Sequence, residues 1–503
     1  MPRTLSLRAW SEGVAPGVPE DDLAHRPLAL CLSGGGFRSY ACVTGQLRAL
    51  ADRGVLDEVG MISAVSGGAW AASAYAYAPG AVRARLGERI PASELTLDAL
   101  ASSIDESHLA HPVTQMDAMA HARTLDADGV DSSRLFSRVL RDQLLAPLGI
   151  DTDRGLLAGG DDHLEDLLAR NPDLDRTEFL TPQPGRAPVV TGASMMLRAS
   201  DRYRYIPVEL APSSVTTGWP VEEWPVRSIE LLALIGAPRT EVTPGLVDVD
   251  LDETFGLDDL LAATGGAPGG VLVEVAAMLG LDAERLVLRA AHWLGRDTVP
   301  FLVDGGYVEN TGLLAALRRG ADRLVVLVNS NVGLVSRYSP FGVHGFEGQL
   351  SRLFDRRPSL GSYSRRSLQL FEDELPALSE KMAARQAAGE LPWAIHDHRL
   401  VPDNVLGLPE KTVRILWQLN EVPQGWASQL PDETQRSLAT PFAELHGVPH
   451  FGVAFAQGGY LFRLRPAQIG AMVALHDHAL QSLPDEVWEA LLAGPEVPLP
   501  DGL

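Results

Sequence analysis

Short apolar runs, each followed by a glycine-rich turn and a helical pattern, organise the first eighty residues. Residues 28–32 are continuously apolar, as expected of a strand buried on both faces of a sheet, and apolar positions recur at helical spacing over 37–52. The same order returns with an apolar run at 61–65 and an alanine-rich helical pattern at 69–77. Two such units in succession predict an α/β fold with a mostly parallel sheet and helices on its faces.

Later segments have the pattern of further core elements. Three are apolar runs typical of buried strands, at 187–195, 301–303 and 324–328. Residues 467–480 follow Pro466 and are typical of an amphipathic helix, because proline favours the first helical position. Residues 451–464 suggest additional strands.

The remaining segments define the expected domain organisation. Three polar or proline-punctuated stretches are interpreted as helical caps or insertions, near 80–185, 220–295 and 345–440. We therefore expect a polar extension at 1–25, a single α/β domain at 26–485 and a C-terminal tail at 486–503.

Charge and composition narrow the classes of function. The 42 basic and 65 acidic residues give a net charge of −23, which disfavours nucleic acid as a partner and opposes adsorption to anionic bilayers. The only two cysteines, Cys31 and Cys42, exclude a disulfide framework and are expected to be buried as small apolar side chains. No signal core or long apolar run is present, so the expected location is cytoplasmic.

Ser66 is a candidate nucleophile. It lies where the apolar run 61–65 meets the following helical pattern, with Ala64 before it and Gly67 and Gly68 after it. A strand-to-helix turn that exposes a nucleophile needs small neighbours, and the new helix points its first N–H groups toward the serine. The same string also fits an ordinary turn, so Ser66 by itself does not establish an enzyme.

A run of three glycines, Gly34, Gly35 and Gly36, follows the first apolar strand. Glycines at a strand end let backbone N–H groups point into a cavity at the start of a helix, which creates an anion site. In acyl transfer the anion is the tetrahedral oxyanion. The alternatives are a tight turn and a phosphate-binding loop. A Walker loop is ruled out, because no Gly-Lys-Ser/Thr follows the glycines.

Asp304 is a candidate general base. It ends the apolar run 301–303 and precedes Gly305 and Gly306. Asp-Gly-Gly alone is a turn signal, but a carboxylate close to a serine can accept its proton. All three glycine-containing motifs follow predicted strands, and the carboxyl ends of parallel strands are where α/β folds place their sites.

Together these motifs resemble the patatin-like phospholipases, and more closely the catalytic domain of cytosolic phospholipase A2. Residues 33–38, Ser-Gly-Gly-Gly-Phe-Arg, match the family's glycine-rich segment, which carries the oxyanion hole and an essential arginine. Ser66 matches the nucleophile, although Ala64 replaces the usual glycine, and Asp304 matches the downstream aspartate. The stretch 207–212, followed by Gly218, resembles the family's Phe-Glu-x-Thr-Pro segment.

This resemblance covers roughly residues 26–80, 187–218 and 300–330. It implies a fold, an activity and a set of site residues that the residue pattern alone does not establish. It implies a three-layer α/β sandwich and a lipid acyl hydrolase of the phospholipase A or lysophospholipase type, a serine carboxylic-ester hydrolase. Ser66 and Asp304 would form the catalytic dyad, Gly34, Gly35 and Gly36 the oxyanion hole, and Arg38 the anion site for substrate phosphate. Phospholipid or lysophospholipid would be the substrate, with peripheral membrane contact and no cofactor.

Two other readings stay open. The first is an α/β-hydrolase esterase with a Ser-Asp-His triad, for which His344, His446 and His450 are candidates. The second is a non-catalytic scaffold that binds lipid or anions through the glycine run. No metal site is expected, although the strings His396-Asp397-His398 and His476-Asp477-His478 and the acidic stretch after Asp248 could suggest one.

Overall fold

A computed structural model of the chain describes most of its residues. The described residues are 3–10, 20–198, 203–218, 226–234, 236–251, 253–266, 288–289, 301–331, 333–334, 346–354, 368–450, 464–500 and 502–503. They divide into two units, each built from several stretches of sequence. Unit 1 comprises residues 1–22, 61–79 and 118–319, and unit 2 comprises residues 23–60, 80–117 and 320–503.

Unit 2 contains a four-stranded sheet whose first three strands are parallel. The strand order is β2 (Leu28–Leu32), β14 (Arg323–Val328), β16 (Thr412–Leu419) and β15 (Trp393–Arg399), and only β15 is antiparallel to its neighbour. All five residues of β2 are buried, which explains its uninterrupted apolar sequence.

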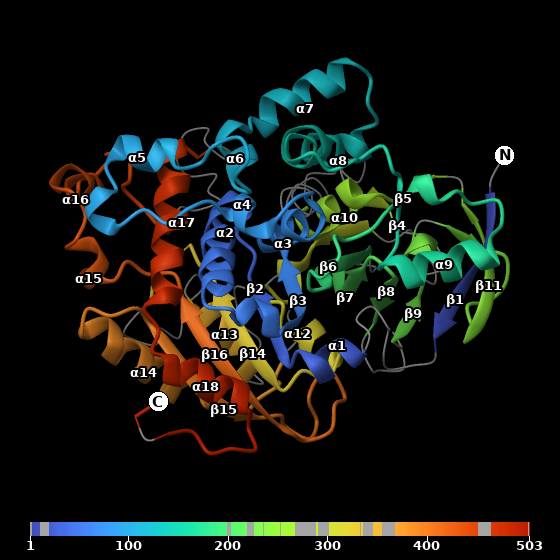
Figure 1. The fold of residues 1–503 in the computed structure, drawn as a ribbon. Helices are drawn as coiled ribbons and strands as arrows, with labels where there is room; N and C mark the ends of the chain where they lie inside the picture. Colours follow the sequence, from blue (N-terminus) through green and yellow to red (C-terminus); the bar gives the residue numbers. More distant parts are fainter. Residues whose placement is uncertain are drawn as a thin grey trace. The chain divides into compact units, whose positions relative to one another are not determined.

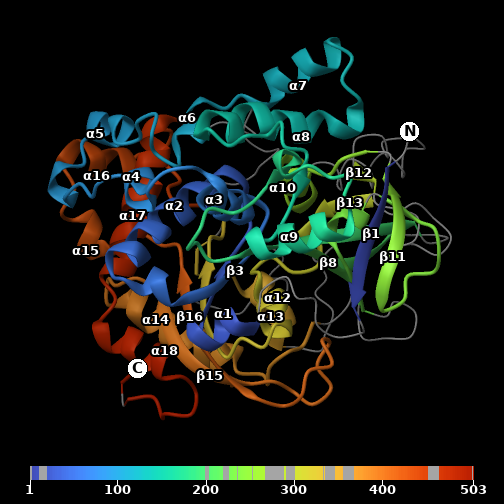
Figure 2. The same cartoon turned by 45° about the vertical axis from the view of Figure 1, so that its right-hand side comes forward.

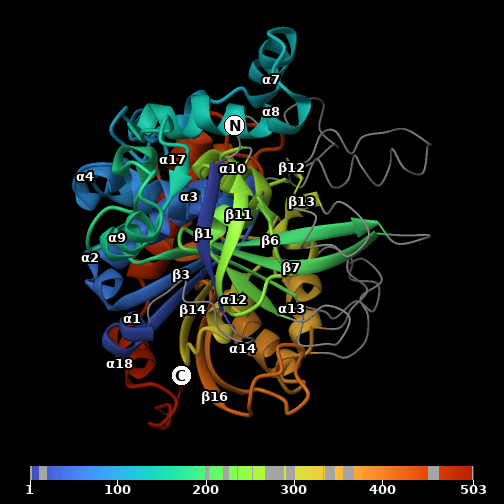
Figure 3. The same ribbon diagram turned by 90° about the vertical axis from the view of Figure 1, so that its right-hand side faces the viewer.

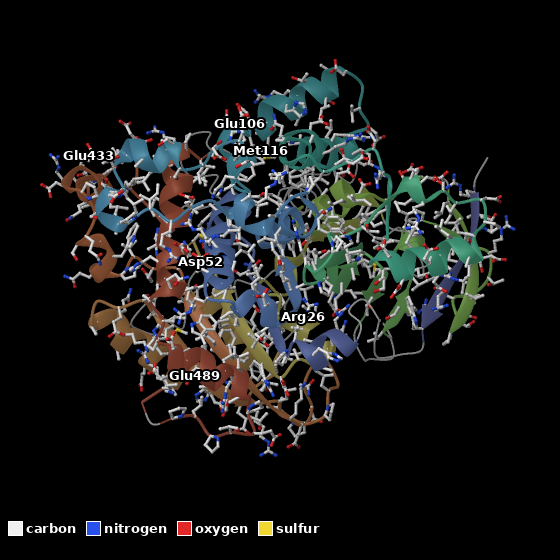
Figure 4. All side chains as sticks on the ribbon, viewed as in Figure 1. Arg26, Asp52, Glu106, Met116, Glu433 and Glu489 are labelled. Carbon is white, nitrogen blue, oxygen red and sulfur yellow. The ribbon has the colours of Figure 1, made fainter. Side chains whose placement is uncertain are left out.

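Two long helices of unit 2, α2 (Gly36–Asp52) and α17 (Pro466–Gln481), pack side by side (Figures 1 and 2). A Cβ added at Gly45 would lie 2.2 Å from the carbonyl oxygen of Val473, so glycine is what allows the close approach of these helices. Asp52, labelled in Figure 4, ends α2 and accepts a 2.7 Å hydrogen bond from Arg89.

The other elements of unit 2 are η1 (Val55–Glu58), α4 (Val82–Leu86), η2 (Ala92–Glu94), α5 (Leu97–Ser102), α6 (His111–Gln115), α13 (Phe346–Phe354), α14 (Leu375–Ala387), α15 (Gln424–Ala427), α16 (Asp432–Ala439) and α18 (Asp485–Ala493). The short helix α1 (Glu20–His25) crosses the boundary between the units.

Unit 1 is built on a mixed sheet. Strand β3 (Val59–Val65) runs parallel to β6 (Val189–Arg198), and β6 pairs antiparallel with both β7 (Tyr203–Ala211) and β13 (Phe301–Asp304). Antiparallel pairing then continues through β8 (Ser214–Thr217), β9 (Arg227–Ile229), β1 (Arg3–Trp10), β11 (Gly245–Leu251) and β10 (Ala237–Pro238), and the β1–β11 pair is seen in Figure 3. Strand β12 (Leu288–Arg289) pairs with β13.

Helices and short segments complete unit 1. They are α3 (Ser66–Tyr77), α7 (Ala118–Ala127), η3 (Ser132–Arg134), α8 (Leu135–Leu140), η4 (Arg141–Leu145), η5 (Ala146–Leu148), β4 (Leu156–Leu157), α9 (Asp161–Arg170), η6 (Arg176–Glu178), β5 (Phe179–Leu180), η7 (Leu231–Leu234), α10 (Leu257–Thr264), η10 (Gly305–Tyr307) and α12 (Leu313–Arg318). The expected α/β fold, with parallel strands and flanking helices, is confirmed.

Several details of the expected domain organisation need correction. The supposed polar extension at 1–25 contains β1, which pairs over seven residues with β11, itself part of the supposed insertion at 220–295. The supposed lid at 345–440 supplies β15 and the parallel strand β16, and the supposed tail at 486–503 contains most of α18, which packs on β14 and β16. The additional strands expected at 451–464 fall almost entirely outside the described residues.

No helix among the described residues is both long and apolar enough to cross a bilayer. Cys31 and Cys42 are not joined in a disulfide and both are buried, as the sequence predicts.

Candidate active site

Ser66 occupies a strained turn between a buried strand and a helix of unit 1. It follows β3 directly and is the first residue of α3, and its φ of 51° lies in the left-handed region that non-glycine residues rarely adopt. The small residues on both sides, which suggested a nucleophile turn in the sequence, are all buried. The side chain of Ser66 is itself 7% exposed. Backbone strain of this kind costs about 1–3 kcal/mol and persists only where the surroundings enforce it.

Asp304 lies at the end of a strand that shares a neighbour with the strand of Ser66. Because β7 occupies one side of β6, β3 and β13 both pair with its other side, with Val65 paired with Gly192 and Asp304 paired with Ala193. Gly192 and Ala193 are consecutive, so the ends of β3 and β13 meet and are offset along β6 by one residue, a rise of about 3.4 Å. The structure therefore brings the two candidate dyad residues to the same point of one sheet in unit 1.

Gly305 packs closely against β6 and the end of β3. A Cβ added to it would lie 2.3 Å from the carbonyl oxygen of Gly192 and 2.9 Å from Cγ1 of Val65. The residue after Asp304 is thus packed against the residue before Ser66. The approach requires that residue 305 has no side chain.

The Asp304 carboxylate is held by its own turn. Its Oδ1 accepts a 2.7 Å hydrogen bond from the N–H of Gly306, and the side chain caps the short helix η10. Asp304 is 5% exposed. A fixed, largely buried carboxylate can act as a general base to a serine that lies within hydrogen-bond reach of it.

We expect Gly305→Ala to lower both stability and any activity that depends on Ser66 and Asp304. The added methyl group clashes with the backbone of Gly192, so β13 must move away from β6, at a cost of about 1–3 kcal/mol. Thermal unfolding and ester hydrolysis measure the two effects. Gly425→Ala is the control, because a Cβ there meets no atom within 4 Å. Wild-type stability in Gly305→Ala would contradict the close approach described above.

The sequence did not reveal Thr264 as a site residue. It ends α10, inside the stretch interpreted as an insertion, and its Oγ1 accepts a 3.0 Å hydrogen bond from the N–H of Ser66. The same hydroxyl donates to the carbonyl oxygen of Gly192. The sequence signal for it was the string Thr264-Gly265-Gly266 after an apolar helical pattern.

The glycine run belongs to unit 2 and forms the start of α2. Gly35 and Gly36 have φ values of 150° and 59°, so at least these two positions require glycine. A Cβ at Gly35 would lie 2.5 Å from Nη2 of Arg38, whose guanidinium packs against the loop. The first N–H groups of α2 have no carbonyl partner within the helix, and the N-terminus of a helix favours a bound anion.

Arg38 is buried, and its guanidinium binds protein backbone. Its Nε and Nη2 donate hydrogen bonds of 3.3 Å and 3.1 Å to the carbonyl oxygen of Asn329. The N–H of Asn329 donates in turn to Oγ of Ser33, just before the glycines. Burial lowers the pKa of the Arg38 guanidinium to about 10, so it stays charged at neutral pH. Asn329, which the sequence did not single out, thus ties Arg38 to the glycine run.

The stretch 207–212 contributes a buried ion cluster in unit 1. Glu209, 3% exposed on β7, pairs with Arg318 at 2.6 Å and with Arg319. Glu209 and Gly305 line one small cavity of about 20 Å³ with Val65 and Gly192. This volume is too small for substrate, and the role of Glu209 is therefore structural.

Three late histidines are candidates for completing a triad. One of them is hydrogen-bonded to other groups, one is exposed, and one lies outside the described residues. In unit 2, His450 hydrogen-bonds Glu421 at 3.2 Å and the carbonyl oxygen of Ser330 at 3.3 Å, whereas His446 is exposed. His344 lies outside the described residues.

The strongest metal candidate among the described residues is Glu374, His396 and His398 in unit 2. Nε2 of His398 accepts a 2.9 Å hydrogen bond from Trp417, so the ring proton of the neutral imidazole sits on Nδ1, 2.6 Å from Glu374. Neither nitrogen of His398 is then free to bind a metal. In the second histidine string, Nδ1 of His476 donates to the carbonyl oxygen of Met472. In the acidic stretch after Asp248, Asp250 forms an ion pair with Arg239.

Known proteins resemble this chain in sequence pattern and in fold. The model of the patatin-like phospholipase family matches residues 30–317. Among solved structures, human GIVD cytosolic phospholipase A2 is similar with a TM-score of 0.53 and 14% identity, over 95% of this chain and 65% of that chain. The same human enzyme bound to methyl γ-linolenyl fluorophosphonate and terbium chloride gives a TM-score of 0.43 with 13% identity, over 93% and 59%. This chain therefore spans about two thirds or less of the length of these structures, and no curated protein matches it.

Proposed function

Because this chain belongs to the patatin-like phospholipase family, we propose that it hydrolyses fatty-acyl esters of phospholipids or lysophospholipids through Ser66 and Asp304. The observation that carries the proposal is the packing of Gly305 on Gly192 and Val65, which supports an interaction between the two side chains. The strained backbone of Ser66 is the second support, because such strain is concentrated at functional positions.

The proposed reaction has two steps. Asp304 accepts the hydroxyl proton of Ser66 while the serine oxygen attacks the ester carbonyl, and the alcohol part of the lipid leaves with that proton. Water then attacks the acyl-serine, Asp304 accepts its proton, and the fatty acid leaves as Ser66 regains its hydroxyl. The reaction needs no metal or organic cofactor.

The amides of Gly34, Gly35 and Gly36 are the proposed oxyanion donors. The positive φ values at Gly35 and Gly36 and their place at the start of α2 support this assignment. Arg38 remains a predicted anion-binding residue for substrate phosphate, but its bonds to Asn329 favour a second role, which is to fix the shape of the glycine run.

If Ser66 and Asp304 act as a dyad, ester hydrolysis does not need a histidine side chain. We expect His344→Ala, His446→Ala and His450→Ala each to keep at least about half of the wild-type rate, whereas loss of a triad histidine would lower it by about 10²–10⁴-fold. Ester hydrolysis by each purified variant measures this. A loss of that size in any of the three, with normal unfolding, would favour the esterase with a Ser-Asp-His triad.

The proposed function is tested with defined lipids and a covalent probe. Wild-type protein is incubated with phosphatidylcholine and with lysophosphatidylcholine, and released fatty acid is measured by mass spectrometry. A fluorophosphonate probe should label Ser66 and should not label Ser66→Ala. Lipid binding without labelling or release would instead support the non-catalytic scaffold.

A further inference from the structure

Thr264 connects three parts of the candidate site through one hydroxyl group. This fully buried residue accepts a hydrogen bond from the N–H of Ser66 at 3.0 Å and donates one to the carbonyl oxygen of Gly192. Gly192 lies on β6, where it is paired with Val65 and precedes Ala193, the partner of Asp304. A threonine hydroxyl donates one hydrogen bond and accepts others, so both of these backbone groups are satisfied by the same atom.

The first of these hydrogen bonds compensates for a feature of the turn itself. The N–H of Ser66 opens α3 and has no carbonyl partner within that helix. A buried N–H without a partner is costly, and the left-handed backbone of Ser66 adds strain. The Thr264 hydroxyl therefore stabilises the conformation that presents the serine.

The second consequence concerns the oxyanion. Since the N–H of Ser66 is already bonded to Thr264, it is not free to donate to a tetrahedral intermediate. The nucleophile's own amide is thus excluded as an oxyanion donor, which is consistent with donors from the glycine run.

Thr264 is held in place by the helix that carries it. Trp70 of α3 donates a 3.0 Å hydrogen bond to the carbonyl oxygen of Leu261, one turn before Thr264. At the other end of α10, Asp259 pairs with Arg134 at 2.5 Å. Both ends of α10 are therefore fixed to neighbouring elements of unit 1, and the position of the Thr264 hydroxyl is defined by more than its own contacts.

We propose that Thr264 is a positioning residue for the nucleophile, acting by locking the backbone of Ser66 to β6. This inference rests on the proposed function for its kinetic consequences, but not for its structural ones. The hydroxyl sets the direction of the serine side chain relative to Asp304, and a misplacement of about 1 Å in such a geometry lowers rates by about 10²-fold.

The test replaces the hydroxyl by a methyl group of the same shape. Thr264→Val is expected to slow fluorophosphonate labelling of Ser66 and to lower kcat by about 10- to 100-fold with little change in KM. Thr264→Ser keeps the hydroxyl and should stay within about threefold of wild type. Thr191→Val is the matched control, because Thr191 is a buried threonine of β6 whose hydroxyl donates to the carbonyl oxygen of Leu210 and touches no part of Ser66.

A second readout does not depend on activity. Hydrogen exchange at the N–H of Ser66, followed in a peptide containing that residue, should be faster in Thr264→Val than in wild type or Thr191→Val. If the wild-type protein neither hydrolyses lipid nor reacts with the probe, the proposed function fails, and exchange alone decides the role of Thr264. If Thr264→Val does not fold, Thr264→Ser decides it.

Three results would overturn the proposal. One is unchanged exchange and labelling in Thr264→Val. Another is an equal loss in Thr191→Val, which would indicate general damage to β6. The third is a loss in Thr264→Ser of more than about tenfold, because that variant retains the hydroxyl group.

Discussion

Replacement of Asp304 by asparagine is expected to slow ester hydrolysis by about 10²–10⁴-fold while leaving the fold intact. Asparagine has the same shape, and its oxygen can still accept the hydrogen bond from the N–H of Gly306 that caps η10. Only the capacity to accept a proton from Ser66 is removed. The variant therefore separates the chemical role of this carboxylate from its role in the turn.

The measurement is released fatty acid under saturating lipid, together with thermal unfolding. Asp175→Asn is a matched control, since Asp175 also caps a short helix of unit 1 through an N–H two residues later, that of Thr177. Ser66→Ala sets the lower limit of the rate. Asp304→Asn with more than about a tenth of the wild-type rate would remove Asp304 from the mechanism.

Glu209→Leu is expected to destabilise unit 1 by about 3–5 kcal/mol, since it leaves Arg318 and Arg319 buried without their carboxylate. Both arginine side chains are only 4% exposed, so water cannot replace the lost partner. Denaturant unfolding measures the change. Asp153→Ala is the control: its side chain is 88% exposed and paired with Arg141, and a surface pair contributes about 0–1 kcal/mol.

The effect of Glu209 should depend on pH. Burial raises the pKa of Glu209, but the charges of Arg318 and Arg319 outweigh burial, and the folded pKa lies below the usual value of 4.5. A carboxyl whose pKa is lowered on folding adds stability above its unfolded pKa and loses it as the pH falls through the folded value. The difference between wild type and Glu209→Leu should therefore be full at neutral pH and shrink in acid below about pH 4. A difference that grows in acid would contradict the pairing.

Much of the candidate site could be predicted because its signals are local. The apolar strand, the small residues around Ser66, the glycine run and Asp304 at a strand end each lie within a few consecutive residues, and the backbone conformations they require are local properties. The fold class followed from the same alternation of strands and helices. Segments with weaker patterns were misassigned: β1 alternates exposed and buried positions and resembled a polar extension.

The misassigned strands share a physical cause. Strand β16 was placed in an insertion because the stretch 345–440 is mixed and punctuated by proline; within the strand, Arg414 and Gln418 are buried and paired. A polar residue in a core strand is tolerated only if a distant partner satisfies it, and the partner of Arg414 is Asp397 on β15. Sequence patterns cannot reveal such pairing between strands.

The sequence by itself therefore determined the chemical groups of this protein: a serine in a strand-to-helix turn, a carboxylate at a strand end and a run of glycine amides. The tertiary structure alone decided that the strands before Ser66 and Asp304 meet on one side of β6, that Gly305 packs on Gly192, and that Thr264 holds the amide of the serine. Residue type and spacing fix local backbone conformation. Contacts across roughly 200 residues, such as the one between Ser66 and Thr264, depend on how the strands pair and on where the glycines let them approach.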